Sequence, residues 1–173
     1  IPNTFRRLFS EGTFNAAFVP SYSSQLAIKK KAKYFANTIF NILLISLLFL
    51  VFLVEIFMPG FVFIIAPGFE KNIDKLDLTI TLTRITFPFL LFVSLSSFFS
   101  AILNSHNKFA AASASPIILN ICLIITLSLS NYLNDQLVLY LSFAVSLAGL
   151  FQLLFLIYFV KKYFIPSLSF KFN

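Results

Sequence analysis

The sequence predicts an all-α, polytopic membrane protein with about five transmembrane helices. Of its 173 residues, 59% are hydrophobic and only 11% are charged, and the mean hydropathy is +0.93. Soluble domains carry about 25% charged residues. The apolar residues also fall in long blocks, unlike the short alternating runs of outer-membrane barrel strands. Both observations indicate helices that cross a bilayer several times.

Four blocks reach the roughly 20 apolar residues that a spanning helix needs. Each is too long for an ordinary buried strand. They cover residues 35–58, which include LLISLLFLVFLVEIF, and residues 85–103, 110–130 and 137–160. We expect one helix in each block.

The opening stretch, PNTFRRLFSEGTFNAAFVP, is more polar but also has helical spacing. Phe14 and Phe18 lie four residues apart and form one expected contact pair. A second apolar stripe consists of Phe5, Leu8, Phe9, Gly12 and Ala16. We therefore predict a fifth helix over residues 4–26, which Pro20 kinks or ends.

Prolines predict where the other helices break or bend. Pro59 follows the first long block and predicts that this helix breaks before a short segment near the membrane surface. Pro88 lies near a helix start, where proline is tolerated. Pro116 lies inside a block, where its ring removes a backbone hydrogen bond, so we expect a kink there.

The distribution of basic residues predicts the orientation. With one crossing per block, eight Lys and Arg side chains lie on the side of Lys29 and Lys108, and three lie on the other. Short cytoplasmic loops are enriched in such residues, so the Lys29 loop is expected to be cytoplasmic. This asymmetry, with added attraction to anionic membrane lipids, accounts for most of the net charge of +7 and argues against nucleic-acid binding.

Residues for catalysis are scarce. The chain has one His and one Cys, no glycine-rich phosphate loop and no carboxylate pair placed for acid–base work. His106 lies in the polar loop NSHNK, where a solvated or headgroup-facing side chain is expected in preference to a metal ligand. We therefore predict a protein that is not an enzyme and uses no cofactor and no metal.

Charged and polar side chains within the membrane-spanning blocks are stronger indicators of a functional site than His106, because they are energetically costly there and usually face cavities or partners. Glu55 and Arg84 lie toward the outer ends of their helices and are explained by snorkelling or by a mutual pair. A polar row on one helix can line an interior face or serve as hydrogen-bonding contact between helices. This row consists of Ser94, Ser97, Ser100 and Asn104.

The opening helix places Arg7 four residues before Glu11, so these two side chains can neutralise each other. Arg6 projects about 100° away from Arg7 and has no acidic residue three or four positions away. Its planar guanidinium suits bidentate contact with phosphate. Two readings remain open from the residues alone: Arg6 faces a cavity and binds an anionic group, or both arginines snorkel to the outer headgroups.

The opening stretch resembles the PNLLRRxFAEGAFxxAFVP motif of the MurJ (MviN) family, the flippases of the lipid-linked peptidoglycan precursor. The similarity continues through IIAPGF at residues 64–69, through ITFPFLLFVSLSSFFSAILNSHNKFAAASASPIILNICLI at residues 85–124, and through AGLFQLL in the last block. It covers essentially the whole chain. The chain opens with Ile1, and we expect it to be a piece of a longer protein.

The resemblance implies that residues 1–173 are a single transmembrane region, part of the N-terminal lobe of a larger two-lobed helical bundle. It implies a multi-pass protein of the bacterial inner membrane that moves lipid II from the inner to the outer leaflet by alternating access, for cell-wall synthesis. The expected partners are lipid II, membrane lipids and further helices of the same chain. By position in the motif, the family's essential arginine falls on Arg6, its neighbour on Arg7, the cavity asparagine on Asn3 and the acidic residue on Glu11.

Departures from the family pattern and other functions stay open at this point. Ala112 or Ser113 stands near a position where many members have proline, and Glu55 has no counterpart in the motifs. An exporter of another polyprenyl-linked oligosaccharide is one alternative, and a cationic cavity argues against export of a cationic drug. A membrane scaffold or an enzyme subunit, with the arginines as topology anchors, is the alternative of a different class.

Overall fold

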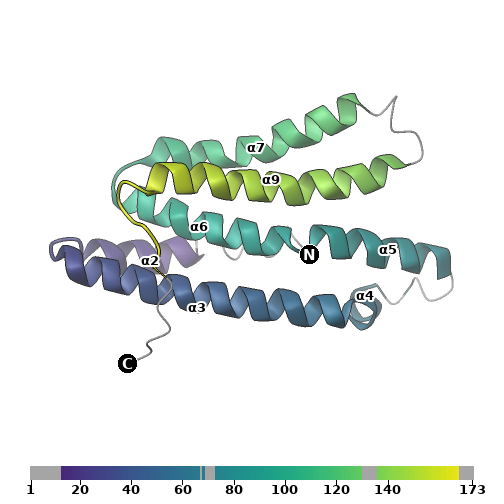
Figure 1. The fold of residues 1–173 in the computed structure, drawn as a ribbon, viewed down its shortest axis with the longest axis horizontal. Helices are drawn as coiled ribbons and strands as arrows, with labels where there is room; N and C mark the ends of the chain where they lie inside the picture. Colours follow the sequence, from purple (N-terminus) through teal and green to yellow (C-terminus); the bar gives the residue numbers. More distant parts are fainter. Residues whose placement is uncertain (1–12, 67, 69–72, 130–135, 168–173) are drawn as a thin grey trace.

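The computed structural model describes residues 13–66, 68, 73–129 and 136–167. These residues form helices and connecting turns, with no strand among them. The helices are α2 (Thr13–Ser23), α3 (Lys29–Ile56), α4 (Met58–Ile65), α5 (Ile73–Thr86), α6 (Phe89–Ser105), α7 (Phe109–Ser128) and α9 (Leu137–Val160). Figure 1 shows an elongated bundle whose long helices run along one axis. The predicted all-α class is confirmed.

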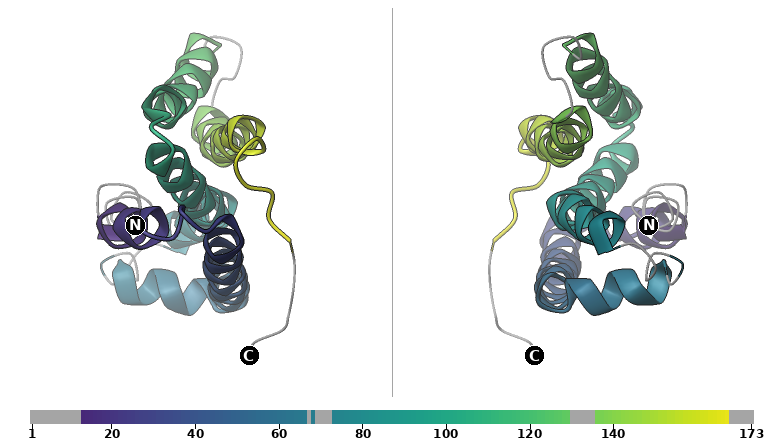
Figure 2. Two further views of the ribbon diagram at one scale, coloured as in Figure 1. Left: turned by 90° about the vertical axis from the view of Figure 1, so that its left-hand side faces the viewer. Right: turned by 90° about the vertical axis from the view of Figure 1, so that its right-hand side faces the viewer.

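Helix α6 is the centre of the bundle. It contacts α2 and α3 on one side and α7 and α9 on the other (Figure 2). Almost every residue of α6 from Phe89 to Leu103 is buried, whereas α3, α7 and α9 expose large apolar side chains on their outer faces. Phe49 and Phe52 of α3, for example, are 65% and 67% exposed. Helices with such faces are suited to lipid or to further helices.

Four helical segments are long and apolar enough to cross a membrane, by length and composition. They are α3, the run of α5 and α6 over Ile73–Ser105, α7 and α9. These segments coincide with the four expected blocks. Helix α2 is described from Thr13 onward and is not among them; residues 4–12 of the fifth expected helix lie outside the described residues.

The structure extends the second expected span. The expected block begins at residue 85, but residues 73–84 are also helical and belong to α5, which is nearly collinear with α6 in Figure 1. The stretch LDLTITLTRIT is too polar to register as a spanning block, yet Thr79 and Thr86 donate their hydroxyl protons to carbonyls four residues earlier. Hydropathy reports burial in lipid and not helicity, which is why this helix was missed.

Helix α3 begins at Lys29, six residues before the expected start of its block. Its first turns contain Lys29, Lys30, Lys31 and Lys33, which lower the hydropathy but favour helix formation. At the other end, the expected break before a short segment is confirmed, because α3 ends at Ile56 and α4 carries Pro59 in its first turn. Proline is accepted there since that backbone nitrogen has no partner within the helix.

One turn, closed by two backbone hydrogen bonds, connects α6 to α7. Asn107 has a positive φ of 58°, and its neighbour Lys108 donates its backbone N–H to the carbonyl of Leu103 over 2.8 Å. The N–H of Asn107 also bonds the carbonyl of Asn104, which completes a Schellman cap on α6. Helix α7 then continues through Pro116 and bends away from α9 (Figure 1), as expected for an internal proline.

The segment after α9 ties the bundle together at one end. Phe164 is buried and its ring lies 5.8 Å from that of Phe98. Farther along, the backbone N–H of Ser167 donates to Asn37 Oδ1 over 3.1 Å, and Asn37 Nδ2 donates to Ser167 Oγ over 2.8 Å. The segment therefore crosses from α9 to α3.

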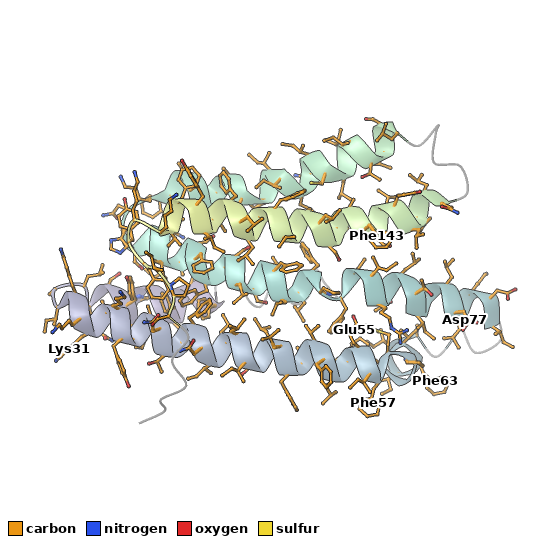
Figure 3. The ribbon with its side chains drawn as sticks, viewed as in Figure 1. Lys31, Glu55, Phe57, Phe63, Asp77 and Phe143 are labelled. Atoms are coloured by element: carbon orange, nitrogen blue, oxygen red, sulfur yellow. The ribbon has the colours of Figure 1, made fainter. Side chains whose placement is uncertain are left out.

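The two ends of the bundle differ in charge. The α2–α3 turn, the α6–α7 turn and the end of α9 lie at the same end in Figure 1, and we call this the basic end, after Lys29, Lys108 and Lys161. Figure 3 shows Lys31 at this end and Glu55 and Asp77 at the other. Lys29, Lys108 and Lys161 thus lie at one end of the described bundle, as the orientation argument requires.

Candidate functional site

The residues that the sequence singles out for substrate binding lie outside the described part of the chain. They are Asn3, Arg6, Arg7 and Glu11. The structure describes the continuation of the same motif, TFNAAFVP, at the start of α2. How α2 is held in the bundle therefore bears on where the motif is placed.

An aromatic stack fixes α2 against the core. The rings of Phe14 and Phe18 are stacked with centroids 5.3 Å apart, which confirms the expected contact pair, and Tyr22 continues the stack at 5.4 Å from Phe18. Phe18 also meets Phe98 of α6 edge to face at 5.3 Å and Phe35 of α3 at 5.8 Å. Such aromatic pairs favour defined geometries, so this stripe fixes the rotation of α2 about its axis.

The polar row on α6 faces the interior of the bundle. Ser94 and Ser97 are buried, while Ser100 and Asn104 are partly buried. The side chains of Ser97 and Ser100 line a cavity of about 40 Å³ between α6, α7 and α9, which Ser115, Pro116 and Gln152 also line. The hydroxyl oxygens of Ser94 and Ser96 are buried and have no hydrogen-bond partner among the described residues.

Glu55 and Arg84 form an ion pair, which is one of the two explanations that the sequence left open. Arg84 Nε lies 3.4 Å from Glu55 Oε2, which joins α3 to α5 at the end opposite the basic end (Figure 3). The Arg84 side chain is 50% exposed and that of Glu55 is 26% exposed. Because each of these charges has the other as its partner, the ion pair explains why both are found in apolar helices, and no role in substrate binding has to be assigned to either.

His106, expected to be solvated or to face the headgroups, is partly buried between two tyrosines. Its ring stacks on Tyr163 with centroids 4.5 Å apart and meets Tyr22 edge to face at 6.0 Å. The Tyr22 hydroxyl lies 3.4 Å from His106 Nε2. Partial burial lowers the pKa of His106 below its ordinary value, because the charged form loses solvation. The fold brings these three residues together from positions far apart in the sequence.

These aromatic residues form one wall of a hollow that we call the basic hollow. It has a volume of about 610 Å³ and is lined by Tyr22, Lys29, Lys33, His106, Lys162 and Tyr163, among others. A second hollow of about 420 Å³ shares Lys162 and Tyr163 with it and adds Lys108 and Lys161. From the sequence, the lysines were assigned to membrane orientation and to attraction to anionic membrane lipids, and no sequence pattern connects Tyr163 with Tyr22.

Comparison with known proteins identifies the family. The family model "Lipid II flippase MurJ" matches residues 1–173. Proteins named "Probable lipid II flippase MurJ" are similar throughout: that of Rickettsia prowazekii is 44% identical over 166 residues, and that of Rhizobium tropici is 42% identical over 158. The Helicobacter pylori protein of the same name is 32% identical over 172 residues.

These matches cover 94%, 88% and 99% of this chain, respectively, but 32%, 30% and 36% of the relatives. The chain thus spans about a third of the length of the curated relatives it matches. The predicted resemblance is confirmed over its full extent, together with a fold that has several apolar helices suited to a multi-pass membrane protein. The chain belongs to the lipid II flippase MurJ family.

Proposed function

We propose that this chain is part of a flippase that moves lipid II from the inner to the outer leaflet of the bacterial cytoplasmic membrane. The observation that carries the proposal is the match of the family model to all 173 residues. The transport is non-catalytic in this proposal, since the protein changes the leaflet of the lipid and breaks no bond. The helices that complete the bundle would come from the remaining two thirds of a protein of the relatives' length.

In this proposal Arg6, helped by Arg7, binds the diphosphate of lipid II, and Asn3 and Glu11 complete the polar site. A guanidinium presents several N–H donors in a plane and can bind phosphate oxygens in pairs. The aromatic stack of Phe14, Phe18 and Tyr22 supports this assignment, because it holds the helix that follows the motif in a single rotation. A site for a charged headgroup needs such positioning.

Complementation tests the proposal. A chimaera in which these 173 residues replace the matching third of the Rickettsia prowazekii relative is expressed in bacteria depleted of their own lipid II flippase. We expect the chimaera to rescue growth, and Arg6→Ala to abolish rescue at matched membrane expression, because the diphosphate loses its paired donor. Arg6→Lys keeps the charge without the planar fork and should rescue poorly.

The outcome also separates the alternatives. If Arg6→Gln and Arg7→Gln rescue as well as the parent chimaera, the arginines are topology anchors and not ligands, since snorkelling needs no particular geometry. If the parent chimaera reaches the membrane but never rescues, this chain does not serve lipid II transport. Another lipid-linked oligosaccharide then becomes the substrate to test by binding.

A further inference from the structure

The basic hollow concentrates positive charge without a compensating acid. Lys29 and Lys33 of α3 and Lys162, which follows α9, line it together. Lys108 and Lys161 line the adjoining hollow. Of the described residues that line either hollow, none is Asp or Glu. The described acids Glu55, Asp74 and Asp77 belong to the opposite end of α3 and to α5.

The backbone adds to this positive potential. Helix α3 begins at Lys29 with no acidic residue in its first turn. The N–H of Lys31 donates to the Ile28 carbonyl over 2.9 Å, and no side chain caps the N–H groups of Lys29 and Lys30. The N-terminal end of a helix carries a partial positive charge, and lysines in that turn are unfavourable there. Helix α7 begins beside Lys108 in the same way. An anion is the ligand that would stabilise this arrangement.

The opposite wall of the hollow is aromatic and held in place. His106 lies between Tyr22 and Tyr163, with its ring 4.5 Å from that of Tyr163 and its Nε2 3.4 Å from the Tyr22 hydroxyl. Next to it, the ammonium of Lys161 lies over the ring of Tyr158 at 4.3 Å, so this lysine is already engaged. Tyrosine and histidine combine an apolar body with a polar tip and are suited to the interface between lipid and water.

We propose that the basic hollow binds the phosphate groups of a lipid-linked diphosphate, as a second phosphate site apart from Arg6. This inference rests on the proposed function. The hollow supplies three lysines, which match the two or more negative charges of a diphosphate ester better than the single charge of a common phospholipid. Arg6 precedes Tyr22 of the hollow by 16 positions in the sequence, so the two groups of basic residues are separate. The hollow would hold the headgroup before it reaches Arg6.

A matched pair of double variants tests the site. Lys29→Gln with Lys33→Gln removes two charges from the hollow, whereas Lys30→Gln with Lys31→Gln removes two charges from the same helix turn without touching either hollow. Binding of polyprenyl diphosphate and of phosphatidylglycerol to the detergent-purified chimaera is measured by native mass spectrometry. Far-ultraviolet circular dichroism and gel-filtration elution must match the parent.

We expect the hollow variant to weaken binding of the diphosphate about tenfold and the control variant to change it less than about twofold, because charge-assisted hydrogen bonds depend on position and general attraction does not. Equal weakening by both variants would overturn the proposal, since only the net charge would then matter. Binding of phosphatidylglycerol as tight as that of the diphosphate, and equally sensitive to Lys29 and Lys33, would overturn the assignment to a diphosphate.

The same chimaera separates this inference from the proposed function. Rescue of growth that depends on Arg6, with diphosphate binding unaffected in the hollow variant, would refute the second site and leave the flippase proposal standing. Selective diphosphate binding that depends on Lys29 and Lys33, in a chimaera that never rescues growth, would support the site and refute the transport function.

Discussion

Gly149 allows α9 to approach α6 more closely than any other residue would. A Cβ atom built at this position would lie 2.6 Å from Phe89 Cδ2 and 3.2 Å from both Phe89 Cε2 and Phe92 Cβ. Carbon atoms pack best at about 3.5–4.0 Å, so the Gly149→Ala methyl requires the Phe89 ring or α9 to shift by about 1 Å. Phe89 is buried, with 3% of its surface exposed, and has little room to move.

The change in stability caused by Gly149→Ala is the sum of two opposing effects. Overpacking of this kind costs about 1–3 kcal/mol. Alanine is favoured over glycine inside a helix by about 1 kcal/mol, which partly offsets the clash. Gly60 in α4 provides the control, because a Cβ there would meet nothing within 4 Å. We therefore expect Gly149→Ala to be about 1–3 kcal/mol less stable than Gly60→Ala.

Thermal unfolding of both variants in the same detergent measures the difference. At about 2–4 °C per kcal/mol for a chain of this length, Gly149→Ala should melt roughly 2–12 °C below Gly60→Ala. Adding Phe89→Leu to Gly149→Ala should recover part of the loss, with a coupling of about 0.5 kcal/mol or more. Equal melting temperatures for the two alanine variants would show that α6 and α9 do not meet at Gly149 as described.

Three further predictions concern local features. Asn107→Gly should keep the stability of the parent, whereas Asn107→Val should lower the free energy of unfolding by about 1–2 kcal/mol, seen as a lower melting temperature. The reason is that the positive φ of 58° suits glycine and not a β-branched residue. Equal melting temperatures for the two variants would argue against the Schellman cap. The free energy of unfolding should fall as pH drops from 7.5 to 5.5, since burial lowers the pKa of His106 in the folded state and the unfolded state binds more protons below 6.5. Tyr22 and Tyr163 contact His106, and Lys29, Lys33 and Lys162 line the same hollow. His106→Gln should flatten this slope, and an unchanged slope would assign it to other groups. A double-mutant cycle of Glu55→Gln and Arg84→Gln should give a coupling of about 0.2–1 kcal/mol, since the Arg84 side chain is half exposed; no measurable coupling would mean that each charge is solvated separately.

The helices that lie in lipid were predictable, because long apolar blocks have no other stable environment and because their length is set by the bilayer. The sequence also predicted the break before Pro59 and the contact of Phe14 with Phe18, and it offered the pairing of Glu55 with Arg84 as one of two explanations. Each of these depends on residues near in sequence or on a charge that requires a partner. Family membership was likewise legible in the motifs around Arg6 and in the last block.

Helix α5 was missed because its polar composition lowers its hydropathy. Its threonine hydroxyls donate to carbonyls of the same helix, so polar side chains are accommodated there. The clustering of Tyr22, His106 and Tyr163 was not predictable, since these residues are separated by more than 50 positions in the chain and meet only when α2, the α6–α7 turn and the end of α9 reach the same end of the bundle. Spacing along the chain determines which residues share a helix face. Which faces meet is decided by packing between helices, where the close approach at Gly149 and the burial of Phe98 select one arrangement.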